Sequence, residues 1–277
     1  MPGRIIACFL LMVAGANGQT QLHYERVVEG KIRERFEMVH ADMQERYRRL
    51  KAMFENAGCT GDRLSEQPVR REKYPNLVCV LPGETEEEYL VGAHFDYFRG
   101  EGALDNWSGA SLLPSLYESL ARTQRKHTFR FVAFTAEEKG LVGSRFYAEG
   151  VKKGTLPRPK AMINLDCLGL GQPNLWFSGG DLALNNRIHS LAVKLQIKLS
   201  LVDIGGVGTT DSESFRKIGV PAATVHSVTQ ETLNIINSDN DTREKLKFGD
   251  YYDTYRLLAL TLASLDVLPV TFAAAGK

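Results

Sequence analysis

The sequence has no marked excess of charge of either sign, with 34 Lys and Arg residues against 33 Asp and Glu in 277 residues. This balance gives no electrostatic reason to expect nucleic acid or an anionic membrane as a partner. Hydrophobic residues make up 43% of the chain, which is ordinary for a globular protein with a sizeable core. No internal repeat, low-complexity tract or Pro- and Gly-rich linker divides the chain, so we expect one folded domain.

Two common hydrolase motifs are also missing. The sequence contains no G-x-S-x-G, which argues against a serine nucleophile. It also contains no H-E-x-x-H, which argues against a zinc site built on two histidines of one helix.

Long apolar runs are absent except at the N-terminus. Residues 1–18 are typical of a secretory signal peptide, with Arg4 before the apolar run Ile5–Val13 and small residues after it. The run is too short for a comfortable membrane span. We therefore expect cleavage near Gly18 and a secreted or periplasmic domain over residues 19–277; an uncleaved N-terminal anchor is the alternative.

Cysteine is scarce, with four residues, of which three follow the predicted signal. Export permits disulfides. Cys59 and Cys79 flank one predicted passage from helix to strand, so we predict that they pair. Cys167 follows a predicted core strand and is expected to be a small buried side chain.

The hydrophobic pattern predicts an α/β fold. Between residues 22 and 57, apolar residues recur every three or four positions among charged ones, which predicts an amphipathic helix, or two, against the core. After Gly58, short apolar runs alternate with helical stretches. This alternation predicts a single domain with a twisted, mixed but mostly parallel sheet of about eight strands and helices on both faces. The predicted strands are 77–81, 89–93, 129–134, 162–165, 175–177, 199–202 and 222–225, and the later helices are 109–122, 141–150, 185–194, 212–218 and 251–265.

The most informative feature is the adjacent pair Glu137 and Glu138 at the end of the apolar run Phe131–Phe134. Two carboxylates side by side at a buried strand end repel each other unless a strong positive charge lies nearby. A metal ion is the best candidate for that charge.

Other strand ends carry matching groups. His94 and Asp96 follow the strand 89–93, Asp166 follows the strand 162–165, and Asp105 begins a helix after a short loop. Ligands in open α/β sheets collect beyond the carboxyl ends of the strands. Two divalent cations would balance four carboxylates, and histidine with carboxylate oxygen suits zinc. We expect Asp96 to orient the His94 imidazole. The four carboxylates are Asp105, Glu137, Glu138 and Asp166.

These motifs resemble those of the M28 family of zinc aminopeptidases, which also contains glutaminyl cyclases. The resemblance covers about residues 75–265. It implies that His94 and Asp166 hold one zinc, that Glu138 holds the other, and that Asp105 bridges the two. It also implies that Glu137 is the general base that takes a proton from metal-activated water. The matching segments are His94-x-Asp96, Gly102-Ala-x-Asp105-Asn-x-x-Gly109, Ala136-Glu137-Glu138-x-Gly140-x-x-Gly143-Ser144 and Asn164-x-Asp166.

One position departs from the family pattern. The last family ligand is a histidine before an Asp-Thr pair, and Asn237 stands there, ahead of Asp241 and Thr242. An amide oxygen is a weaker zinc ligand than imidazole, so Asn237 could coordinate weakly, His226 could substitute, or that metal could be lost. The sequence therefore leaves open whether the protein binds one zinc ion or two.

Asp211 lies where the family keeps an aspartate close to the metals, so it is a candidate substrate-binding residue; an N-cap of the following helix is the alternative. The resulting function is a metal-dependent exopeptidase that removes N-terminal residues from peptides with a free N-terminus. Two alternatives stay open: a glutaminyl-peptide cyclotransferase, and a peptidase-like module that binds peptides with weakened turnover.

Overall fold

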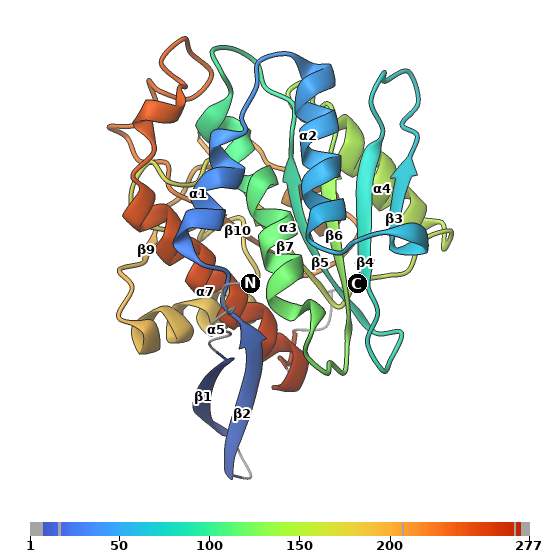
Figure 1. The fold of residues 1–277 in the computed structure, drawn as a ribbon, viewed down its shortest axis with the longest axis vertical. Coiled ribbons are helices and arrows are strands. Elements are labelled where there is room, and N and C mark those ends of the chain that lie inside the picture. Colours follow the sequence, from blue (N-terminus) through green and yellow to red (C-terminus); the bar gives the residue numbers. More distant parts are fainter. Residues whose placement is uncertain (1–7, 16–17, 207, 269, 273–277) are drawn as a thin grey trace, which may run out of the picture.

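A computed structural model describes residues 8–15, 18–206, 208–268 and 270–272 of the chain. Its centre is an eight-stranded sheet in the order β3-β4-β6-β5-β7-β10-β8-β9, with helices packed on both sides (Figure 1). A separate two-stranded hairpin joins β1 and β2. The strands are β1 Cys8–Gly15, β2 Gly18–Glu25, β3 Leu64–Gln67, β4 Asn76–Leu81, β5 Glu88–His94, β6 Thr128–Phe134, β7 Ala161–Leu165, β8 Asn174–Leu175, β9 Ser200–Leu201 and β10 Ala222–His226.

The middle of the sheet is parallel. Strand β5 pairs in parallel with β6 and β7, and β10 pairs in parallel with β7, whereas β4 runs antiparallel to β6 and β8 antiparallel to β10. The carboxyl ends of β5, β6, β7 and β10 therefore meet at one edge. The predicted α/β fold with a mostly parallel mixed sheet is confirmed, and the short edge strand β3 was not predicted.

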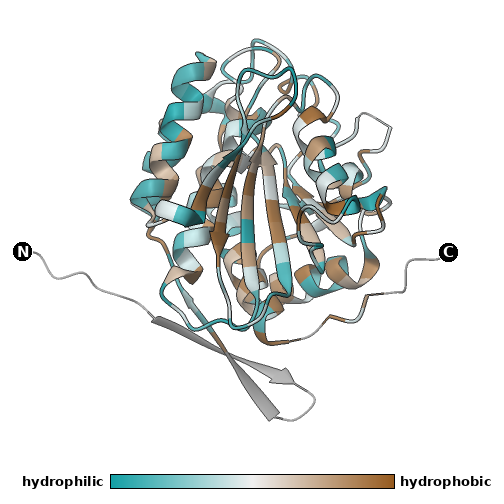
Figure 2. Cartoon of the chain, turned by 90° about the vertical axis from the view of Figure 1, so that its right-hand side faces the viewer, coloured by the Kyte–Doolittle hydropathy of each residue, from teal (hydrophilic) through white to brown (hydrophobic). Residues whose placement is uncertain are grey.

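Two hydrophobic layers cover the sheet. Along β5, Tyr89, Val91 and Ala93 pack into the larger cluster with the helices α1, α2, α3, α5 and α7, while Leu90 faces the smaller one with α4 and α6. Figure 2 shows hydrophobic residues concentrated on the strands between the helical layers. The helices are α1 Glu29–Glu37, α2 Met43–Asn56, α3 Ser108–Ala121, α4 Val142–Lys152, α5 Leu182–Leu195, α6 Ser212–Arg216 and α7 Phe248–Val267; the short helical turns are η1 Gly61–Arg63, η2 Ala103–Trp107 and η3 Arg243–Lys245.

The helical prediction over 22–57 is wrong at its start, and the remainder forms two helices, which the prediction allowed. Leu22 and Tyr24 are buried, whereas His23 between them is exposed. Burial thus alternates with the two-residue period of a strand, and these residues belong to β2. Helix α1 begins only at Glu29, and Asp42 caps α2 by accepting the amide of Glu45 at 2.9 Å. The predicted signal over 1–18 lies partly outside the described residues, and its cleavage stays a prediction.

The cysteine predictions are confirmed. Cys59 and Cys79 form a disulfide that ties the end of α2 to β4, and Cys167 is a buried free thiol. Among the described residues, every helix is too short or too polar to cross a bilayer.

Candidate metal centre

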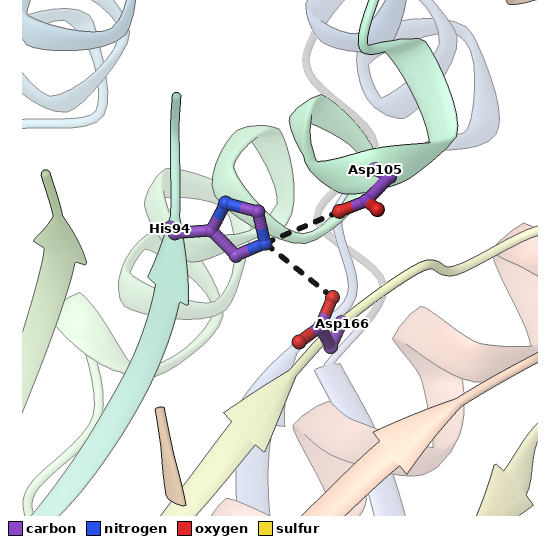
Figure 3. Close-up of side chains that lie close together, drawn as sticks. All are labelled: His94, Asp105 and Asp166. Atoms are coloured by element: carbon purple, nitrogen blue, oxygen red, sulfur yellow. Dashed lines mark ion pairs between the residues drawn. The ribbon is translucent and has the colours of Figure 1, made fainter. Parts of the chain in front are cut away.

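Three side chains from separate segments converge at the carboxyl edge of the sheet (Figure 3). His94 is the last residue of β5, Asp166 directly follows β7, and Asp105 lies in the turn η2. His94 Nε2 lies 3.3 Å from Asp105 Oδ1 and 3.5 Å from Asp166 Oδ1. All three side chains are buried. This arrangement gives one nitrogen and two carboxylate oxygens around a common point.

The two glutamates join the same histidine. Because β5 and β6 are parallel neighbours with His94 opposite Phe134, residues just beyond β6 lie beside His94. Ligand atoms of His94, Glu137 and Glu138 lie within 4.8 Å of one another, as do those of His94, Asp105 and Asp166. Glu138 Oε1 is buried and has no hydrogen-bond partner within the described part of the chain. An orphaned carboxylate oxygen in such a cluster is what a bound cation would satisfy.

The acids of this cluster perturb one another. Burial raises the pKa of Glu137 to about 9, Asp211 and Asp166 add to the rise, and His94 opposes it. Burial, with Asp105 next, raises the pKa of Glu138 to about 8. Although burial acts against it, the pKa of His94 is raised by Glu137 and the neighbouring aspartates. These residues, His94, Asp105, Glu137, Glu138 and Asp166, are called the cradle below. Full ionisation of the cradle carboxylates is therefore unfavourable unless a cation is bound.

Asp96 connects the two strand ends. Its backbone carbonyl lies 3.2 Å from His94 Nδ1, and its carboxylate oxygen is farther from that nitrogen, at 3.6 Å. The carboxylate accepts the backbone amides of Glu137 at 3.0 Å and Glu138 at 3.1 Å. Burial opposes ionisation, but His94 and these amides hold the pKa of Asp96 below its usual value. Asp96 therefore fixes the glutamate pair as well as facing the imidazole.

Asp241 supports the ligand turn, a role that the sequence did not suggest. Its carboxylate accepts the amides of Leu104 at 2.7 Å and Asp105 at 3.0 Å. It is 1% exposed, and burial raises its pKa to about 6. The only sequence signal was its place in the Asp-Thr pair after Asn237.

A cavity of about 220 Å³ opens onto the cluster. Asn237 lines it with a backbone φ of 55°, and His226 lines it from the end of β10. His226 Nδ1 accepts the amide of Val228 at 3.2 Å, so the ring proton sits on Nε2. Burial lowers the pKa of His226 to about 4, and the Val202 backbone opposes that shift. Further cavity residues that the sequence did not single out are Cys167, Ile204, Gly208, Thr209, Thr210, Val228 and Ile236.

Asp211 occupies the N-cap position of α6, as the alternative interpretation expected, but its side chain makes no capping hydrogen bond to that helix. Its side chain is 0% exposed. Among the described residues, neither carboxylate oxygen has a partner at ordinary hydrogen-bond geometry, although the Ser144 hydroxyl favours the ionised form. Burial raises its pKa to about 7. Among the described residues, Asp211 is not part of the cavity wall; its neighbours Thr209 and Thr210 are.

The fold and the site define an α/β protein with an acidic cradle for divalent cations at the carboxyl edge of a parallel sheet. One imidazole nitrogen and several carboxylate oxygens form a donor set that suits zinc. The residues therefore fit such an ion.

The profile of Peptidase family M28 matches residues 76–260, and the chain belongs to this family. It is 28% identical over 197 residues to a probable leucine aminopeptidase of Arthroderma otae, covering 66% of this chain and 55% of that protein. The chain spans about half the length of such curated relatives.

Two solved structures share the fold. The LapA aminopeptidase of Legionella pneumophila superposes with a TM-score of 0.78 at 22% identity, over 87% of this chain and 73% of that chain. The glutaminyl cyclase of Fimbriiglobus ruber gives 0.67 at 16% identity, over 85% of this chain and 93% of that chain. At these identities the likeness concerns the fold alone.

Proposed function

We propose that the protein is an exported zinc aminopeptidase that hydrolyses the N-terminal residue from peptides. The observation that carries this proposal is the convergence of Glu137 and Glu138 with His94, beside Asp105 and Asp166, at one cavity. The family membership and the aminopeptidases among its relatives support the same reaction. Export rests on the N-terminal sequence.

The ligand roles follow the donor geometry. His94 and Asp166 would hold one zinc, Glu138 would hold a second, and Asp105 would lie between them. Zinc bound there would polarise a carbonyl and make a nearby water more acidic. Because zinc binds neutral imidazole, it must displace the proton that the surrounding acids favour on His94.

Glu137 is the proposed general base. It belongs to the same cluster as His94 and Glu138, and its amide is anchored by Asp96. Its carboxylate would take a proton from the attacking water and deliver it to the amine that leaves when the peptide bond breaks. A cation in the cradle would lower its pKa from about 9 toward the range in which it can accept that proton.

The number of zinc ions depends on Asn237. Its amide oxygen can complete the Glu138 side of the cavity only weakly. His226 is a poor substitute for Asn237 as a zinc ligand. Its Nδ1 already accepts the backbone N–H of Val228, and its Nε2 carries the ring proton. We therefore propose one firmly held zinc on the His94 side and a weaker one beside Glu138.

The substrate end of the cavity is mixed in character. Ile204, Val228 and Ile236 give it an apolar wall, which suits an uncharged N-terminal side chain, and the carboxylates suit the α-ammonium group. Asp211 is proposed to act from behind this wall by raising the pKa of Glu137, and direct substrate contact at Asp211 stays a prediction.

An assay with two substrates tests the proposal against the alternatives. Zinc-loaded protein is offered an aminoacyl anilide and an N-terminal glutaminyl peptide. Release of free amino acid from the anilide, abolished by chelator, supports the aminopeptidase. Ammonia release with ring closure and no free amino acid would instead identify a cyclotransferase. Equal inactivity of wild type and Glu137→Gln toward a broad aminoacyl panel would favour the peptide-binding module.

A further inference from the structure

Arg46 is a buried cation that contacts the loop between β5 and η2. It lies on α2, and its side chain is 0% exposed. Burial lowers its pKa to about 10, so the guanidinium remains charged at neutral pH. Burying a charge costs free energy unless its hydrogen-bond donors are satisfied. The contacts of Arg46 show where that cost is offset.

Among the residues that the structure describes, every hydrogen-bond acceptor of Arg46 is a backbone carbonyl. Nε donates to Phe95, Nη2 donates to Gly102 at 2.6 Å, and Nη1 donates to Glu101 at 3.0 Å. A longer bond of 3.4 Å reaches the carbonyl of His40. The guanidinium carbon also lies 5.1 Å from the ring centres of Tyr97 and Trp107. The planar fork of an arginine can reach several carbonyls at once, whereas a lysine presents one nitrogen.

Three of these carbonyls, those of Phe95, Glu101 and Gly102, sit at the two ends of the loop that joins β5 to η2. Phe95 lies between His94 and Asp96, and Gly102, with a φ of 59°, immediately precedes η2, the turn that contains Asp105. Arg46 therefore holds the end of β5 and the start of η2 at a fixed separation. Asp241 holds the same turn through the amides of Leu104 and Asp105.

The charge of Arg46 also acts on the site. Asp241, Asp96 and Asp105 oppose the effect of burial on the pKa of Arg46. The guanidinium in turn favours the ionised form of Asp241. Helix α2 lies outside the residues that match the family profile, 76–260.

We propose that Arg46 is a positioning residue of the metal centre, which fixes the loop 95–102 so that His94 and Asp105 reach a common ion. The inference rests on the proposed function, because it assumes that the cradle binds zinc. It makes α2 part of the machinery of the site although no atom of that helix belongs to the ligand cluster.

The test compares Arg46→Met with Arg35→Met in the full chain. Arg35 is a matched control, because it is also buried, at 4% exposure, but pairs with Glu118 and Ser115 on α3. Zinc affinity is measured by competition with a chelating dye, below the unfolding temperature of each variant. We expect affinity to fall by about 10- to 100-fold in Arg46→Met, as for other partners that orient metal ligands, and to stay within about threefold in Arg35→Met.

Two outcomes would overturn the inference. One is wild-type zinc affinity in folded Arg46→Met; the other is an equal loss in both variants, which would show a general effect of lost packing. If Arg46→Met does not fold, Arg46→Lys serves instead, because it keeps the charge but not the fork. We expect the zinc affinity of Arg46→Lys to be about tenfold below that of wild type. Unchanged zinc affinity in folded Arg46→Lys would also overturn the inference.

The zinc readout separates this inference from the proposed reaction. Wild type that binds zinc but cleaves no aminoacyl substrate would refute the aminopeptidase and leave the role of Arg46 standing. Wild type that binds no zinc would refute both. Loss of zinc affinity in Arg46→Met alone, with hydrolysis restored at high zinc concentration, is the expected result.

Discussion

The carboxylate of Asp96 accepts the backbone amide of Glu137 at 3.0 Å. It binds the next amide, that of Glu138, in the same way, while its own backbone carbonyl faces the imidazole of His94. Asp96, two residues beyond the end of β5, thus sets the position of the two glutamates that follow β6. This link couples the ligand histidine to the proposed base.

Replacing Asp96 by Asn should loosen that link. The Asn side chain offers one oxygen and one N–H₂ group, so one of the two glutamate amides would face a donor. We expect zinc affinity to fall by about tenfold or more, measured by chelator competition. Asp239→Asn, on the exposed loop nearby, is the control, and a similar loss in both variants would contradict a specific role for Asp96.

Glu137→Gln should remove catalysis and leave the ligands in place. An amide cannot take a proton from water, so kcat should fall by about 100- to 10,000-fold, while zinc affinity changes little. Steady-state hydrolysis of an aminoacyl anilide and zinc titration measure the two quantities. The surface variant Glu149→Gln is the control. Retention of full activity in Glu137→Gln would assign the base to another group.

Asn237→His should strengthen the metal site beside Glu138. Imidazole is a better zinc ligand than an amide oxygen, so the bound zinc should rise from about one to about two ions per chain. Metal analysis after gel filtration at limiting free zinc measures the stoichiometry. Two ions in both wild type and variant would show that Asn237 does not weaken the site.

The zinc-free protein should lose stability as pH rises. Burial raises the folded-state pKa of Glu137 to about 9 and of Glu138 to about 8, above the values of an unfolded chain. The folded state thus binds protons that the unfolded state has released, so stability is greatest below the unfolded pKa and declines through the folded ones. Thermal unfolding in chelator should show a decline between about pH 5 and about pH 9.

The variant Glu137→Gln provides the control for this pH effect. It cannot ionise, so without zinc it should exceed wild type in stability at high pH by at least about 1 kcal/mol. A pH profile that is the same for both zinc-free proteins would exclude Glu137 as a source of the decline.

Removing the Cys59–Cys79 disulfide should destabilise the protein without changing the site. The bond closes a loop with a sequence separation of 20 residues. Loss of a link of this size should lower the free energy of unfolding by about 3 kcal/mol. Urea unfolding of Cys59→Ser/Cys79→Ser measures it. Zinc affinity in the folded double variant should stay at the wild-type value, since both cysteines lie away from the cavity.

The hydrophobic pattern alone determined the sheet and the place of the site. Runs such as 89–93 and 131–134 are apolar throughout because both faces of a central parallel strand are covered. Their ends therefore located His94 and the glutamate pair. The N-terminal segment was misassigned, because Leu22 and Tyr24 satisfy a helical spacing when combined with the residues that follow, and only their packing shows the strand.

What tertiary structure alone decided is which groups hold the ligands in place. The contacts of Arg46 with the loop 95–102 and of Asp241 with the turn at Asp105 join segments far apart in the chain. Neither forms a local motif, because a backbone carbonyl or amide as partner leaves no side-chain signature in the sequence. The sequence determined which atoms could bind a cation, and the packing of distant segments decided that they meet at one point.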